Sequence, residues 1–314
     1  MLTRRHIRIK VMQSVYSFSL GEEKKLDDET IFFKESVAQS FNLYLLLLAL
    51  LKALKNFTEE QLTAYEKHQI NRDENFQMLK HLSKNKALLF IDQHPRLEQH
   101  LKNKKIIRWD LEFTFLKALL KEITSADAFR SYFETKEPTP KEDLNWVMKC
   151  FKEIIAPSSY LYSYLEDHQL TWIDDLPVVN TFMMKMLKQL DPKQSTSLQF
   201  PKPIENLEDL DFGVSLLEKT LSKDEQLLKE LEGKTPNWDA DRIAKLDQVI
   251  LKIAIAELLY FPNIPTKVTL NEYLEIAKDY STPSSNNFVN GVLDKLVREF
   301  QAEKRMMKQG RGLM

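Results

Sequence analysis

The sequence predicts an all-α protein, and three observations support this prediction. Glycine is scarce, with six in 314 residues and none between Gly21 and Gly213. Hairpin turns, dinucleotide-binding fingerprints and phosphate loops need glycine, so these motifs are missing. The chain is instead rich in leucine, lysine, glutamate and glutamine, which favour helices. Apolar residues also recur at helical spacing, as Ile7, Val11 and Phe18 do near the start.

The first half of the chain reads as a series of helices. The first spans residues 3–20, and Gly21 is placed to end it. The second runs from Asp27 to Lys55 and contains the most apolar run, Leu43 to Leu51. That run is shorter than the roughly 20 residues that span a bilayer, so we expect a buried helix. Further helical patterns cover 59–80, 84–103, 110–123, 126–135, 141–155 and 179–190.

Two breaks divide this helical pattern. The first runs from Lys136 to Asp143, and the second, with three prolines, runs from Asp191 to Pro203. We interpret the second break as a boundary between two parts of the molecule. Helices are then expected near 209–231, 239–260, 267–280 and 284–304.

The composition indicates a cytoplasmic protein with no membrane segment. Hydrophobic residues make up 43% of the chain, enough for a core, and the formal net charge is −1. Any nucleic-acid site must therefore come from a local excess of charge. The single cysteine, Cys150, excludes an internal disulfide and a cysteine-rich zinc site. No apolar segment typical of a signal peptide follows the first arginines.

The sequence contains no pattern typical of catalysis. The six histidines form no HExxH motif and no zinc spacing with cysteine, and no GxSxG elbow is present. We therefore expect a protein that is not an enzyme and that holds no metal and no cofactor.

A basic cluster at the N-terminus is more specific. Residues 1–20 contain Arg4, Arg5, Arg8 and Lys10 and no acidic residue. Cations are unfavourable near the positive end of a helix dipole, which suggests a role other than helix support. Guanidinium groups can bind phosphates or stack on bases, so RNA binding is one reading. A solvated terminus without a ligand is the other.

The segment from Pro265 to Lys295 carries two notable residues. Gly291 lies inside a predicted helix, where we expect another backbone to pass close by. Phe288 lies near the start of the same helix, where an aromatic ring can stack on an unpaired base. The pattern by itself favours a core position for Phe288.

Three separated blocks resemble the NusB family of transcription antitermination factors, and they cover roughly residues 1–22 and 205–300. The first block is Arg4-Arg5-His6-Ile7-Arg8 with Gln13-Ser14-Val15-Tyr16-Ser17. The second is Trp238, Asp241-Arg242, Leu246-Asp247, Ile250-Leu251-Lys252, Ala254 and Glu257-Leu258. The third is Asn271-Glu272, Glu275-Ile276-Ala277-Lys278 and Asn287-Phe288-Val289-Asn290-Gly291-Val292-Leu293-Asp294-Lys295.

The resemblance implies a fold and a domain organisation. We expect a NusB-like helical bundle with an additional helical insertion. Residues 1–22 and 205–304 would form a discontinuous RNA-binding core, residues 23–204 the insertion, and residues 305–314 a basic tail.

The resemblance also implies a function. Family members bind the single-stranded boxA element of ribosomal RNA transcripts together with NusE, a small-subunit ribosomal protein, within the RNA polymerase antitermination complex. The implied RNA-binding residues are Arg4, Arg5, Arg8, Gln13, Tyr16, Asn287 and Phe288. The implied partner-facing residues are Asp241 and Asp247, and we expect Asp247 to be exposed at the edge of an apolar stripe.

The sequence departs from the family pattern at several positions. His6 replaces a common arginine, Asn286 and Asn287 replace common His or Lys, and Ser281 replaces a common glycine. One competing interpretation is a helical protein-binding scaffold without RNA binding. Another, a NusB-like domain fused to an RNA methyltransferase, is excluded because no cofactor loop or catalytic cysteine motif is present.

Overall fold

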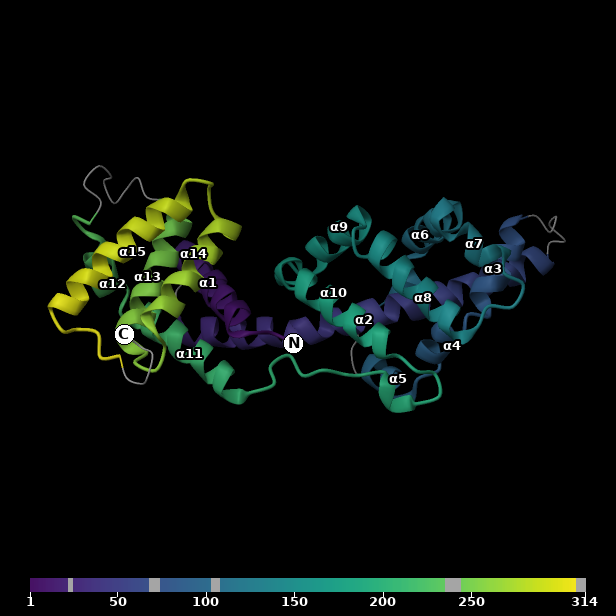
Figure 1. Ribbon diagram of the computed structural model, residues 1–314, viewed down its shortest axis with the longest axis horizontal. Helices are drawn as coiled ribbons and strands as arrows, with labels where there is room; N and C mark the ends of the chain where they lie inside the picture. Colours follow the sequence, from purple (N-terminus) through teal and green to yellow (C-terminus); the bar gives the residue numbers. More distant parts are fainter. Residues whose placement is uncertain (22–24, 68–73, 103–107, 235–243, 309–314) are drawn as a thin grey trace. The chain divides into compact units, whose positions relative to one another are not determined.

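The computed structural model describes residues 1–21, 25–67, 74–102, 108–234 and 244–308, and every regular element in those ranges is a helix (Figure 1). The chain divides into two compact units. The terminal unit combines Leu2–Val37 with Ile204–Met314, and the central unit combines Met1 with Ala38–Pro203. Helix α2 (Leu26–Lys67) begins in the terminal unit and continues into the central unit.

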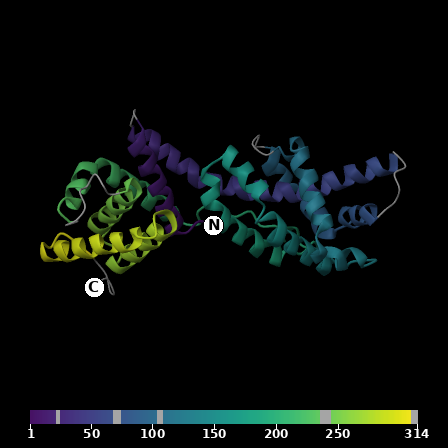
Figure 2. The same cartoon turned by 90° about the horizontal axis from the view of Figure 1, so that it is seen from above.

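The terminal unit is organised around one almost completely buried helix, α13 (Lys245–Tyr260). Its run from Val249 to Leu258 is buried on all sides, because neighbouring helices surround it. Helices α14 and α15 lie side by side, as the yellow-green ribbons of Figure 1 and Figure 2 show. The helices around α13 are α1 (Arg4–Leu20), α11 (Leu207–Ser222), α12 (Asp224–Leu231), α14 (Thr266–Tyr280) and α15 (Ser285–Ala302).

Helix α11 packs closely against α1, and Gly213 makes the approach possible. A Cβ atom at Gly213 would lie 2.4 Å from Phe33 Cζ and 2.6 Å from Ile7 Cγ2. The prediction for Gly291 is wrong, since no described atom of a neighbouring segment lies within 4 Å of a Cβ built there. The close contact that glycine permits in this unit is therefore at Gly213.

The central unit is built on the apolar stretch of α2. Leu43 and the residues through Leu51 are buried, as expected from their composition. By length and hydropathy α2 could cross a membrane, but 72% of its most apolar window is buried inside the protein. The remaining helices of this unit are α3 (Glu74–Ser83), α4 (Lys86–Asp92), α5 (Pro95–Lys102), η1 (Trp109–Leu111), α6 (Phe113–Ser125), η2 (Asp127–Phe129), α7 (Arg130–Glu134), α8 (Pro140–Cys150), η3 (Phe151–Ile155), α9 (Ser159–His168), α10 (Thr171–Gln189) and η4 (Ser195–Ser197).

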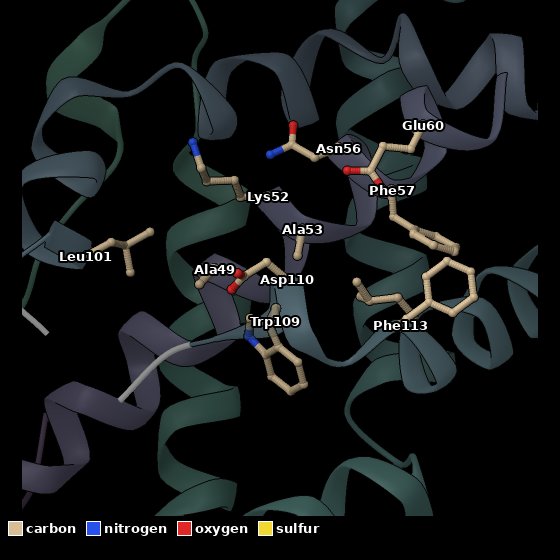
Figure 3. A pocket seen from close by; sticks show the side chains of 11 residues that line it. Ala49, Lys52, Ala53, Asn56, Phe57, Glu60, Leu101, Trp109, Asp110 and Phe113 are labelled. Carbon is tan, nitrogen blue, oxygen red and sulfur yellow. The ribbon is translucent and has the colours of Figure 1, made fainter. Parts of the chain in front are cut away.

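A pocket of about 250 Å³ lies where α2, α5, η1 and α6 meet. Figure 3 shows the rings of Phe57 and Phe113 beside each other at one side, and their centroids lie 5.2 Å apart at 82°. Trp109 closes another side, and its indole N–H donates to the carbonyl of Leu46 at 2.9 Å. These aromatic contacts attach η1 and α6 to the core helix.

Several helix boundaries differ from the prediction. Helix α2 continues without a break through residues 56–58 as far as Lys67. The predicted helix at 84–103 is two helices, because the Asn85 side chain caps α4 and Pro95 begins α5. Helix α9, which Ser158 caps, was not predicted. The predicted helix at 209–231 is interrupted at Lys223, between α11 and α12.

Candidate nucleic-acid interface

Arg8 lies inside the terminal unit rather than on its surface. Its side chain is 3% exposed, and its guanidinium donates from Nε and Nη2 to the two carboxylate oxygens of Glu257, both at 2.8 Å. Thr269 and Tyr273 also donate to this carboxylate, at 2.8 and 3.0 Å. Although burial opposes the charged form, the bond to Glu257 raises the pKa of Arg8 above its usual value. The expectation that Arg8 contacts RNA is corrected, because its guanidinium is used within the core.

Arg4 and Arg5, one turn earlier, are partly exposed. Arg4 is 48% exposed, donates from Nε to Asp209 at 2.6 Å, and stacks over the Phe212 ring. Arg5 is 40% exposed and donates two hydrogen bonds, of 2.8 and 3.0 Å, to Glu272. These bonds to Arg5 hold the pKa of the Glu272 carboxyl below its usual range. Acidic neighbours therefore orient both guanidinium groups at the surface.

These arginines line a pocket of about 620 Å³ between the start of α1 and the connection from α13 to α14. His6 also lines it, and burial lowers the pKa of its imidazole. The ring nitrogen Nδ1 accepts a hydrogen bond from the backbone N–H of Thr3 at 3.1 Å. His6 is consequently neutral near pH 7 and adds no charge to the pocket. Val268, which is 42% exposed, gives the pocket an apolar edge.

Two further predicted RNA-binding residues, Asn287 and Phe288, lie near the start of α15, which packs against α14. Arg5 binds α14 through Glu272, and at the start of α15 the Asn286 side chain donates to the carbonyl of Leu274 on α14 at 2.8 Å. The next two residues of α15 are Asn287, which is exposed, and Phe288, which is partly buried.

Along α1, the surface that carries Arg5 continues through Gln13 and Tyr16. Their spacing places all three on one side of the helix. Gln13 is partly buried, and Tyr16 is 36% exposed. Gln13 and Tyr16 thus lie on the side of α1 that carries Arg5, whereas Arg4 lies about 100° away around the helix.

The expected exposure of Asp247 is wrong. This residue is 5% exposed, and its carboxylate accepts hydrogen bonds from Ser281 at 2.5 Å and from Ser285 at 2.7 Å. Asp247 thus joins the start of α13 to the connection between α14 and α15. The second predicted partner-facing residue, Asp241, lies outside the described residues.

Two glutamates at this site were not predicted. Glu257 holds Arg8 and Glu272 holds Arg5, although neither was assigned a role from the sequence. The sequence does indicate a special role for Glu257, because it is an acid within the apolar helix segment Ile253 to Leu258. A buried carboxylate requires a cationic or hydrogen-bonding partner. Two cations in the described part of the tail are also engaged: Arg305 binds Glu230, and Lys308 donates to the carbonyls of Glu257 and Phe261.

The chain shows similarity to one protein family. The family model of the NusB family matches residues 180–298. This range begins within α10, includes α11 to α14 and ends within α15.

Three relatives of the chain are named for the same family. A Transcription antitermination protein NusB from Salinibacter ruber is 42% identical over 104 residues, which are 33% of this chain and 65% of that protein. The protein of the same name from Chloroherpeton thalassium is 38% identical over 33% of this chain and 49% of its own length. The one from Geotalea daltonii is 41% identical over 27% and 59%. The chain thus matches less than two thirds of the length of each of these relatives.

A solved structure of T. maritima NusB is similar to 44% of this chain and to 85% of its own chain. The two share 24% sequence identity, with a TM-score of 0.29.

Proposed function

We propose that this chain, whose residues 180–298 match the family model of the NusB family, is a transcription antitermination factor that binds boxA-type single-stranded RNA of ribosomal RNA transcripts together with NusE. The observation that carries the proposal is the pocket beside Arg4 and Arg5. The pocket is lined by two oriented, partly exposed guanidinium groups and by an apolar edge.

The arginines retain donors for phosphate although each binds an acid. Arg4 uses its Nε for Asp209, and its two terminal nitrogens make no hydrogen bond with a described residue. Arg5 uses Nε and Nη2 for Glu272, which leaves Nη1 with a 3.8 Å contact to Glu275. A guanidinium held in this way loses less conformational freedom when it binds a phosphate.

Uncharged side chains of α1 and of the start of α15 would recognise the bases. Tyr16 and Phe288 provide rings on which unpaired bases can stack, and Gln13 and Asn287 provide amides for base edges. The charged groups would supply affinity that depends on salt, whereas the rings and amides would supply selectivity. Arg8 keeps α1 in place through Glu257 and does not contact the RNA.

The partners follow from the same proposal. NusE would bind beside this unit, and the pair would join the RNA polymerase antitermination complex in the cytoplasm. Asp247 is too buried to form the NusE contact, so that surface must use other residues. The function needs no catalysis.

A titration with boxA-like RNA, with and without NusE, tests the proposal. The control is an RNA of equal length and composition in scrambled order. We expect tighter binding of the boxA-like RNA, a steep dependence on salt, and a further gain in affinity when NusE is present. Equal and weak binding of both RNAs would instead favour a helical protein-binding scaffold.

A further inference from the structure

The central unit contains a groove of about 790 Å³ between α8 with its continuation η3 on one side and α10 on the other. Nothing in the proposed function uses this groove, because all of its lining residues belong to the central unit. It is larger than the pocket beside Arg4 and Arg5.

Lysines stand along both sides of the groove. Lys149 and Lys152 come from α8 and η3, and Lys185 and Lys188 come from α10. All four are exposed, and the lining includes a single acid, Glu153. Lys149 donates to a backbone carbonyl, whereas the other three lysines form no ion pair with any described residue. The groove therefore carries a net positive charge, because its four lysines face one carboxylate, that of Glu153.

The interior of the groove is apolar with a few polar groups. Met148 and Met184 contribute flexible thioether side chains, which adapt to flat ligands of different shape. Asn145 and Thr181 contribute an amide and a hydroxyl. Asn180 also lines the groove, and its side-chain oxygen is buried and accepts no hydrogen bond from a described residue.

The helix that forms one side of the groove is irregular at this position. Five residues from Phe151 form a π turn, in which the N–H of Ala156 donates to the carbonyl of Phe151 at 2.8 Å. Such turns are weaker than a regular helix and occur frequently at functional sites. Here the turn contains Lys152 and Glu153, which line the groove together with the next groove residue, Ala156.

We propose that this groove binds single-stranded RNA through its phosphate backbone, with little sequence preference. Lysines on both sides would contact phosphates, while the methionines and amides would receive the bases. The positive charge favours an anionic ligand, and the choice of RNA among anionic ligands rests on the proposed function. The central unit would thus add a second RNA contact to that of the terminal unit.

The test uses the full-length chain and oligouridine of about 20 nucleotides, a probe without a boxA sequence. The groove variant is Lys152→Gln with Lys185→Gln and Lys188→Gln. The matched control is Lys117→Gln with Lys121→Gln and Lys141→Gln, three exposed lysines of the same unit outside the groove. Binding is measured by fluorescence anisotropy at several salt concentrations.

We expect the groove variant to lose at least about tenfold in affinity and about 2 units of log–log salt slope, since each single-strand phosphate contact contributes roughly 0.7. The control should retain the affinity and slope of the unmodified protein. Photocrosslinking of oligo-4-thiouridine should label peptides that contain Met148 or Met184. Equal oligouridine binding by the two variants would overturn the proposal.

The outcomes separate this inference from the proposed function. If boxA-like RNA fails to bind selectively but oligouridine still depends on the groove lysines, the proposed function fails and the groove site stands. If boxA selectivity holds while the groove variant binds oligouridine normally, the proposed function stands and the groove site fails. A groove variant that loses binding to polyglutamate but keeps RNA binding would assign the groove to an acidic protein and overturn the RNA site.

Discussion

Arg8 and Glu257 form a buried ion pair that joins the first helix to the central helix of the terminal unit, with two hydrogen bonds of 2.8 Å between them. The two residues are 249 positions apart in the chain. Thr269 and Tyr273 occupy the remaining acceptor positions of the carboxylate. Removal of one partner would leave a buried charge without compensation.

Arg8→Ala should therefore lower the free energy of unfolding by about 3–5 kcal/mol, because Glu257 would lose its cation inside the core. Arg4→Ala is the matched control, since Arg4 is 48% exposed and an exposed ion pair contributes at most about 1 kcal/mol. Urea denaturation followed by circular dichroism measures both. Equal stability of the two variants would show that the pair is not important for folding.

Replacement of Arg4 and Arg5 by alanine should weaken the binding of boxA-like RNA and reduce the log–log salt slope by about 1.4, the value for two single-strand phosphate contacts. The fold should remain, because both side chains are partly exposed. Titration at several salt concentrations gives the slope. A double variant that binds RNA with an unchanged slope would place the phosphate contacts elsewhere.

Phe288→Ala should reduce the affinity for boxA-like RNA by about 1–3 kcal/mol, the range for loss of a stacked base. Phe300→Ala on the same helix is the control, since Phe300 is 1% exposed and its loss should destabilise the fold. Calorimetric RNA titration and thermal unfolding distinguish the two effects. If Phe288→Ala is destabilised yet binds RNA normally when folded, Phe288 belongs to the core.

Asp247→Ala should lower the free energy of unfolding by about 1–3 kcal/mol, because the hydroxyls of Ser281 and Ser285 would lose their acceptor. Asp279→Ala, at an exposed position of α14, should have little effect. NusE affinity of the folded Asp247 variant should match that of the unmodified protein. A selective loss of NusE binding without loss of stability would restore Asp247 to the partner surface.

Gly213→Ala should destabilise the terminal unit by about 1–3 kcal/mol, since the added methyl would overlap the side chains of Phe33 and Ile7. Gly291→Ala should instead stabilise it by about 0.5–1 kcal/mol, because α15 has space at that position and alanine favours a helix. Thermal unfolding of the two variants gives the comparison. A stabilised Gly213 variant would show that α11 can move away from α1 at little cost.

The helical class, the buried stretch of α2 and the basic start of α1 could all be read from the sequence. The scarcity of glycine indicates the helical class, and the apolar run from Leu43 to Leu51 indicates the buried stretch. The basic start follows from four cations without an acid. The resemblance to the NusB family could be read as well, since three separate blocks of residues carry it. Local patterns determine these features before the chain folds.

The tertiary structure alone decided which of the arginines remain available to a ligand. Arg4 and Arg8 lie on one helix one turn apart and look equivalent in the sequence, yet the fold brings Glu257 to Arg8 and leaves Arg4 partly exposed. Asp247 is likewise buried because Ser281 and Ser285 arrive from distant positions. The close approach at Gly213, rather than at Gly291, depends on how α11 meets α1 and α2. Burial and pairing of charges depend on contacts between segments far apart in the chain. Local sequence indicated that Glu257 is buried, but it did not specify Arg8 as its partner.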